Sequence, residues 1–275
     1  MGLDLPVGDL AILAASLAVA GLIAGILAGI FGIGGGAIIV PVMYQALVAL
    51  GFDDSVSFHV ALGTAIAVIV PTAIRSFAAH RVRGAVDMAL LRDWIVAVPA
   101  GAVTATVVAA YASGNQLKAI FAFVAFLIGL RFLFNRATWR LGTELPGLPA
   151  RVAVGGLVGF FATLMGVGGG VMSNLFMTVY GRPIHQAVAT GAGVGVLVAV
   201  PGTLGYMAAG WGAEGLPPFS LGYVNLLGLA LIMPLGTLVA PLGVKLAHRL
   251  SRRHLEIAFG SFLILMSIRF TVSLF

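Results

Sequence analysis

The sequence predicts an all-α integral membrane protein, and three observations lead to this prediction. Hydrophobic residues make up 60% of the 275 residues and charged residues only 9%, whereas a soluble domain carries roughly 25% charged residues. The apolar residues form about ten runs along the whole chain, as expected for helices that span a bilayer. No polar block is long enough for a separate soluble domain. We therefore expect one membrane domain over residues 1–275, surrounded by lipid, that is not an enzyme.

The composition also excludes several partners and cofactors. The chain has no cysteine, which rules out disulfides, thiolate metal sites and iron–sulfur clusters. The net charge is +6, but the basic residues lie between hydrophobic runs and form no stripe typical of a nucleic-acid-binding surface. We expect no nucleic-acid partner, no metal and no cofactor. Asp4 and Asp9 precede the first run, where a cleaved signal peptide would carry positive charge, so the first run is interpreted as a retained helix.

The first five apolar runs predict the helices of the first half. A spanning helix needs about 20 residues, a length that most of these runs reach. The run after the first glycine-rich sequence is shorter, and it either spans or dips into the membrane and returns. The five runs are 10–31, 36–50, 58–79, 88–111 and 116–134.

The second half repeats this order, with two clearly short runs at its start. Residues 152–166 and 170–180 cannot cross a hydrocarbon core about 30 Å thick at 1.5 Å per residue. We interpret them as half-helices that form a glycine-interrupted, re-entrant hairpin. The remaining three runs are 186–210, 221–243 and 255–275.

The basic residues predict the orientation in the plasma (inner) membrane. Lys and Arg in short loops stay on the cytoplasmic side, and twelve of the fifteen fall in alternate loops. The intervening loops hold Asp53, Asp54, Glu214 and a single Lys118. Both termini are therefore expected outside the cytoplasm.

Internal repetition divides the chain into two halves. Gly32-Ile33-Gly34-Gly35-Gly36 recurs as Gly166-Val167-Gly168-Gly169-Gly170. The segments around His59–Thr64 and His185–Thr190 also correspond, as do those that begin at Leu117 and Leu255. We assign repeat one to 10–134, a linker to 135–150 and repeat two to 151–275. Five segments in each repeat is an odd number, so the repeats are inverted, as in many secondary transporters with a substrate site near the midplane.

Several ordered motifs resemble the TauE/SafE family of sulfite exporters. They are the first Gly-x-Gly-Gly-Gly followed by Val40-Pro41, then Ala61-x-Gly63-Thr64, then Arg83-Gly84-Ala85-Val86-Asp87, and the second glycine run. The resemblance covers nearly the whole chain. It implies a carrier for sulfur-containing anions such as sulfite, sulfoacetate and other sulfonates, driven by an ion gradient.

The glycine runs are the first candidate binding residues. Adjacent backbone N–H groups without side-chain obstruction at a helix start suit an oxyanion, helped by the positive end of the helix dipole. The alternative is that the glycines only let two helices pack closely. The predicted substrate-binding residues here are Gly34, Gly35, Gly36, Gly168, Gly169 and Gly170.

Hydroxyl and amide side chains near the glycine runs could complete a hydrogen-bonding cage around the anion. They are Thr64, Thr190, Ser173 and Asn174. Such side chains in membrane helices also bond to their own backbone or to a neighbouring helix. Arg75 lies in an apolar stretch one turn past Pro71. It either binds the anion or extends to the interface.

His59 and His185 occupy matching positions in the repeats and are the proton-coupling candidates, because histidine titrates near neutral pH. No Asp or Glu lies centrally in an apolar run, which argues against a cation carrier. The sequence thus predicts secondary active transport of a small sulfur oxyanion by alternating access between the repeats, with H⁺ as the candidate coupling ion. An anion channel, or a carrier for a carboxylate or another non-sulfur anion, is the alternative, and a homodimer is compatible with the sequence.

Overall fold

The computed structural model describes residues 7–31, 35–134, 140–247 and 251–274. Within these ranges the chain forms eleven helices and one two-stranded hairpin. The elements are α1 Val7–Phe31, α2 Gly36–Ala49, α3 Asp54–Val82, α4 Met88–Trp94, α5 Ala97–Tyr111, α6 Gly114–Leu133, α7 Leu148–Leu164, α8 Gly170–Val179, α9 Ile184–Ala209, β1 Ser220–Leu221, β2 Val224–Asn225, α10 Leu226–Ala247 and α11 Arg252–Val272. The predicted all-α membrane fold is confirmed.

Two predicted segments differ from the structure in detail. The run 88–111 is split into α4 and α5, whose axes bend by 43°. Pro99 lies in the first turn of α5, and a proline cannot donate to the carbonyl four residues earlier, so the helix breaks at that point. The run 221–243 begins as a hairpin, because Gly222 has a φ of +56° between the paired strands.

Helix length separates membrane-spanning from shorter elements. Among the described residues, α3, α6, α9, α10 and α11 are long and apolar enough to cross a bilayer, and the bent α4–α5 pair makes a sixth candidate. In contrast, α2, α7 and α8 have 14, 17 and 10 residues, which is too short for a hydrocarbon core of about 30 Å. The short α7 and α8 match the predicted short runs, and the glycine turn lies between them.

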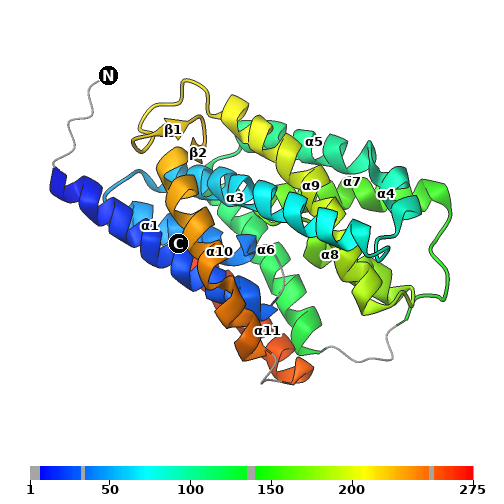
Figure 1. Ribbon diagram of the computed structural model, residues 1–275. Coiled ribbons are helices and arrows are strands. Elements are labelled where there is room, and N and C mark those ends of the chain that lie inside the picture. Colours follow the sequence, from blue (N-terminus) through cyan, green and yellow to red (C-terminus); the bar gives the residue numbers. More distant parts are fainter. Residues whose placement is uncertain (1–6, 32–34, 135–139, 248–250, 275) are drawn as a thin grey trace.

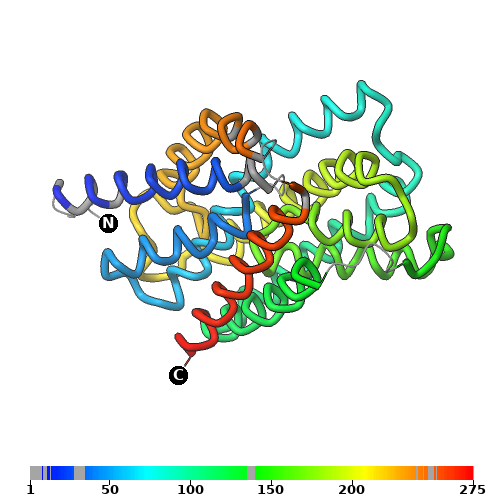
Figure 2. The backbone as a smooth tube through the Cα atoms, turned by 90° about the horizontal axis from the view of Figure 1, so that it is seen from below, coloured from blue at the N-terminus to red at the C-terminus, as the bar shows by residue number. Residues whose placement is uncertain are grey.

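The main helix pairs each contain one helix from the first half of the chain and one from the second half. The first helix of the chain, α1, packs along α10, while α7 packs along α5. In the centre α3 packs on α9, and at one side α6 packs on α11, which Figure 2 shows as the green and red segments. Each of these four pairs therefore joins one helix of the first half to one helix of the second half.

Glycine lets the exchanged helices approach closely. A Cβ built on Gly21 of α1 would lie 2.9 Å from the Cα of Ile232, and one on Gly25 would overlap the backbone of Gly236 in α10. In α7, a Cβ on Gly155 would lie 2.6 Å from the Trp94 ring, and one on Gly159 would overlap the carbonyl oxygen of Val98. Both helices use the small-xxx-small spacing typical of close helix pairs in membranes.

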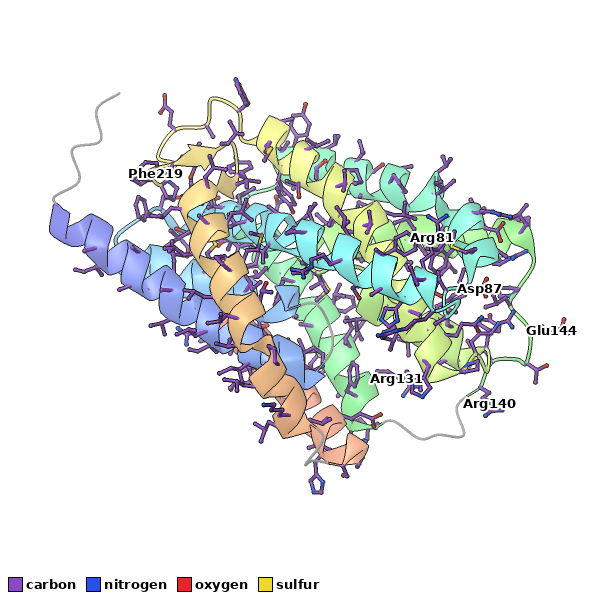
Figure 3. The ribbon with its side chains drawn as sticks, viewed as in Figure 1. Arg81, Asp87, Arg131, Arg140, Glu144 and Phe219 are labelled. Atoms are coloured by element: carbon purple, nitrogen blue, oxygen red, sulfur yellow. The ribbon has the colours of Figure 1, made fainter. Side chains whose placement is uncertain are left out.

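The two ends of the molecule carry different loops. The β1–β2 hairpin and the start of α1 lie at one end, and α4 with the segment before α7 lies at the other (Figure 1). Figure 3 places Arg81, Arg131 and Arg140 toward the second end, opposite Phe219.

Candidate functional site

The two glycine turns have the same backbone conformation. Gly35 precedes α2 with a φ of +73°, and Gly169 precedes α8 with a φ of +66°. Both residues are buried and lie in the left-handed region, which glycine adopts without a steric penalty. Gly34 lies outside the described residues. The repeated sequence motif is thus a repeated helix-start structure.

The two turns also touch each other in the interior. A Cβ built on Gly36 would overlap the carbonyl oxygen of Gly166 and lie 3.0 Å from the Cα of Val167. Gly36 is therefore required for close packing of the two glycine runs, as the alternative interpretation expects. At Gly170 the nearest atom would be the carbonyl oxygen of Gly191, at an ordinary 3.7 Å. Close packing thus accounts for Gly36 but does not require glycine at position 170.

In the first turns of α2 and α8, some backbone N–H groups donate to the glycine before the helix and others have no backbone acceptor in the described part of the chain. The N–H groups of Ile38 and Ile39 donate to Gly35, and that of Ser173 donates to Gly169. Among the described residues, no backbone acceptor is present for the N–H groups of Val171 and Met172. Free N–H groups at a helix start, together with the helix dipole, favour an anion.

A cavity lies beside these helix starts, between the α2 and α7–α8 region on one side and α6 and α11 on the other. All of its lining residues are apolar or glycine, and no polar atom of the described residues is exposed to it, so the cavity itself offers no hydrogen-bond donor. The lining residues are Ala37, Ile128, Ala162, Met165, Val167, Gly169, Val171, Met172, Phe259 and Leu263.

Two of the predicted polar residues of α8 lie against Gly191 of α9, next to the predicted Thr190. Asn174 Oδ1 lies 2.5 Å from the position of a Cβ on Gly191, and Ser173 Oγ lies 3.3 Å from it. Ser173 donates to the carbonyl of Gly170 at 3.2 Å, and Thr190 Oγ1 accepts the N–H of Asp87 at 2.9 Å. Asn174 Oδ1 is buried and has no hydrogen-bond partner in the described part of the chain.

Thr64 makes a contact that matches the one at Thr190. Its Oγ1 accepts the N–H of Asn225 at 2.9 Å. Asp87 and Asn225 each cap a helix, since their side chains accept from Leu90 and Gly228. Each threonine therefore joins its helix to a helix start in the other half of the chain.

Asn225 did not emerge from the sequence as a functional candidate. Its signal was present, because Gly222, Val224 and Asn225 have the spacing of Gly84, Val86 and Asp87. A comparison of apolar runs does not reveal this match, because the short hairpin before α10 lies at the start of the run 221–243.

The two matched histidines have different surroundings. His59 is buried, and its Nδ1 lies 2.8 Å from the carbonyl oxygen of Ser55 while its Nε2 lies 3.0 Å from that of Ala109. Tyr223 covers the ring at 4.7 Å between centroids, and burial raises the pKa of the Tyr223 hydroxyl, so this neighbour is neutral. His185 is exposed. Of the two histidines, only His59 has hydrogen-bond partners within the described part of the chain.

His59→Ala is expected to destabilise the protein far more than His185→Ala. Losing the imidazole leaves the buried carbonyl oxygen of Ala109, near the end of α5, without its side-chain partner, at a cost of about 1–3 kcal/mol. That cost corresponds to a fall of roughly 5 °C in the apparent melting temperature, measurable on purified protein. An equal effect of the two substitutions would contradict the structural role of His59.

Arg75 lies on an exposed face of α3, beside Ile74, which is 47% exposed. No hydrogen bond or ion pair joins Arg75 to another described residue. The structure therefore does not bring Arg75 to the glycine turns. It does bring the two turns together, with Ser173, Asn174 and Thr190 beside the second one.

These features define a multi-pass α-helical membrane protein in which two glycine-capped helix starts meet in the interior. The chain belongs to the sulfite exporter TauE/SafE family, whose family model matches residues 17–270. This match agrees with the resemblance seen in the sequence motifs.

Three relatives carry the name of probable membrane transporter proteins. The protein from Haemophilus influenzae is 29% identical over 239 residues, which covers 87% of this chain and 90% of the relative. The one from Methanocaldococcus jannaschii is 26% identical and covers 94% and 96%, and the one from Bacillus subtilis is 26% identical and covers 70% and 78%. No solved structure matches the chain. Family and relatives together support a role in membrane transport.

Proposed function

We propose that this protein is a secondary carrier for a small sulfur-containing oxyanion, such as sulfite, sulfoacetate or another organosulfonate. The observation that carries this proposal is the meeting of two glycine turns of like conformation, at Gly35 and Gly169, in the protein interior. Both turns direct the positive ends of helices toward the same region. The family name supplies the class of anion.

Backbone donors suit this substrate. An oxyanion that leaves water loses strong hydrogen bonds, and N–H groups at a helix start replace them without a buried cationic side chain. The described residues that line the cavity beside Val171 and Met172 have apolar side chains or none. No polar side chain there competes with the anion for the N–H groups. Ser173 and Asn174 follow Met172 directly in α8 and lie against Gly191 of α9, where they can add side-chain hydrogen bonds to an anion at this helix start.

Alternating access is supported by the way the halves are joined. We assign 10–134 and 151–275 to inverted repeats, because α1 pairs with α10 as α7 pairs with α5, and because Thr64 and Thr190 make matching contacts across the halves. Carriers with inverted repeats bind substrate at the repeat interface near the midplane. Both termini are then outside the cytoplasm. We use "outer end" for the end of the molecule that carries Asp53, Asp54 and Lys118.

Transport assays on purified protein in proteoliposomes test the function. The expected result is saturable uptake of labelled sulfite or sulfoacetate, with counterflow when unlabelled anion is loaded inside, and a dependence on the proton gradient. Non-saturating flux without counterflow would indicate an anion channel instead. Uptake of a carboxylate in preference to every sulfur anion would overturn the substrate class while leaving the carrier mechanism in place.

A further inference from the structure

A second polar cluster lies away from the glycine turns, where α2, α3, α6 and α11 meet at the outer end. The Asp54 carboxylate accepts a hydrogen bond from the Tyr44 hydroxyl through Oδ1 and from the Lys118 ammonium through Oδ2. Beside them, Arg269 donates to Gln45 Oε1 at 2.5 Å. Four helices are thus linked by one carboxylate and one amide.

Aromatic rings pack directly around this cluster. Tyr44, Phe58, Phe121 and Phe270 come from the same four helices, and their ring centroids lie 5.2–6.1 Å apart in edge-to-face pairs. Such pairs add to the stability of apolar packing. The outer end of this helix group is therefore closed by rings and by the polar cluster.

The two charged partners differ strongly in exposure. The Lys118 side chain is 1% exposed, whereas that of Asp54 is 47% exposed. A buried ammonium without a counter-charge is costly, while an exposed carboxylate can be hydrated in place of its partner. Asp54 can therefore leave the pair at a modest cost, but Lys118 needs an anion whenever it keeps its charge in this position.

The donors around Asp54 suit anions other than its carboxylate. A carboxylate presents two oxygen atoms, and here one is held by an O–H group and the other by an ammonium group. Sulfite and sulfonates present the same kind of oxygen pair. Arg269, which is exposed and bonded to a neutral amide, adds a second positive charge next to this position.

We propose that Lys118, Tyr44 and Arg269 form an outer oxyanion site, which Asp54 occupies in this structure as a tethered anion. The transported anion replaces Asp54 at Lys118 when the outer ends of α6 and α11 separate from α2 and α3. The identity of that anion rests on the proposed function, but the existence of the site does not. Opening without an anion would leave the Lys118 charge unpaired, so anion arrival and opening are coupled.

Anion-dependent stability tests the site without a transport assay. The probe is methanesulfonate, exchanged for chloride at constant ionic strength. For Asp54→Asn, which removes the tethered carboxylate, methanesulfonate is expected to raise the apparent melting temperature by roughly 4 °C or more. The matched control is Asp53→Asn, because Asp53 is the neighbouring acid that caps α3 through Ser55 and Val56 and asparagine keeps that cap.

The expected rise is small in wild type and in Asp53→Asn, where Asp54 still competes for Lys118. It is absent in Asp54→Asn combined with Lys118→Met, which removes both charges. The proposal is overturned if Asp54→Asn and Asp53→Asn respond equally, or if the response survives in the double variant.

Thiol labelling tests the coupling in a protein that keeps Asp54. The chain has no cysteine, and Ser57, one turn from Asp54, is fully buried, so Ser57→Cys gives a single buried thiol at the outer end. Methanesulfonate is expected to increase its labelling by an impermeant reagent at least threefold, and Lys118→Met should remove the increase. A labelling rate that does not depend on methanesulfonate would refute the coupling. Labelling and stability responses without any sulfonate uptake would retain the site and reject the proposed function.

Discussion

Gly169→Ala is expected to lower sulfite or sulfonate uptake at least tenfold, and Gly169→Val to abolish it. At a φ of +66° a side chain costs about 1–2 kcal/mol, and the new Cβ would lie 2.9 Å from Val198 and 3.0 Å from Val194. The turn must then shift, which displaces the N–H groups at the start of α8. Initial uptake rates, normalised to the amount of reconstituted protein, measure the effect.

One alanine variant separates the loss of the site from general strain. Gly51→Ala imposes a similar backbone strain, with a φ of +84°, at a surface turn where no atom lies within 4 Å. It is expected to keep most of the uptake. If Gly51→Ala lost as much activity as Gly169→Ala, strain alone would account for the result.

Gly36→Ala is expected to reduce the yield of folded protein severalfold. In a helix, alanine is favoured over glycine by up to about 1 kcal/mol, but here its Cβ overlaps the carbonyl oxygen of Gly166 and approaches Ile69 within 2.9 Å. Overpacking of this kind costs about 1–3 kcal/mol or more. The monodisperse fraction in gel filtration measures the outcome.

Gly156→Ala in α7 is the control for Gly36→Ala, because the nearest atom to its Cβ would be the Ala97 carbonyl oxygen at 3.8 Å. This variant should fold as well as wild type. A normal yield of Gly36→Ala would mean that the two glycine runs do not touch in the membrane.

The all-α fold could be predicted because apolar run length and glycine position act locally. The short run 170–180 became α8, and the repeated glycine motif became two left-handed helix starts at Gly35 and Gly169. The bend between α4 and α5 also has a local cause in Pro99, which the run 88–111 contains. The inverted relation of the repeats stays a prediction.

The contacts of the site could not be predicted in the same way, because they depend on which helices become neighbours. His59 and His185 match in sequence, yet only His59 meets carbonyl oxygens of α3 and α5. Thr64 and Thr190 match in both sequence and contact, but their partners lie far along the chain. Lys118 and Asp54 were visible only as isolated charges between apolar runs, and their pairing requires the approach of α6 to α3.

The packing of α1 along α10 has a consequence for biosynthesis. At about 5–20 residues per second, the ribosome needs roughly 10–40 s after finishing α1 to reach α10. During that interval the glycine face of Gly21 and Gly25 has no helix to pack against and must be covered by lipid or by the insertion machinery. A truncated chain that stops before Leu226 therefore leaves α1 without its partner, and quality control in the membrane would meet an exposed helix rather than a smaller version of the same fold.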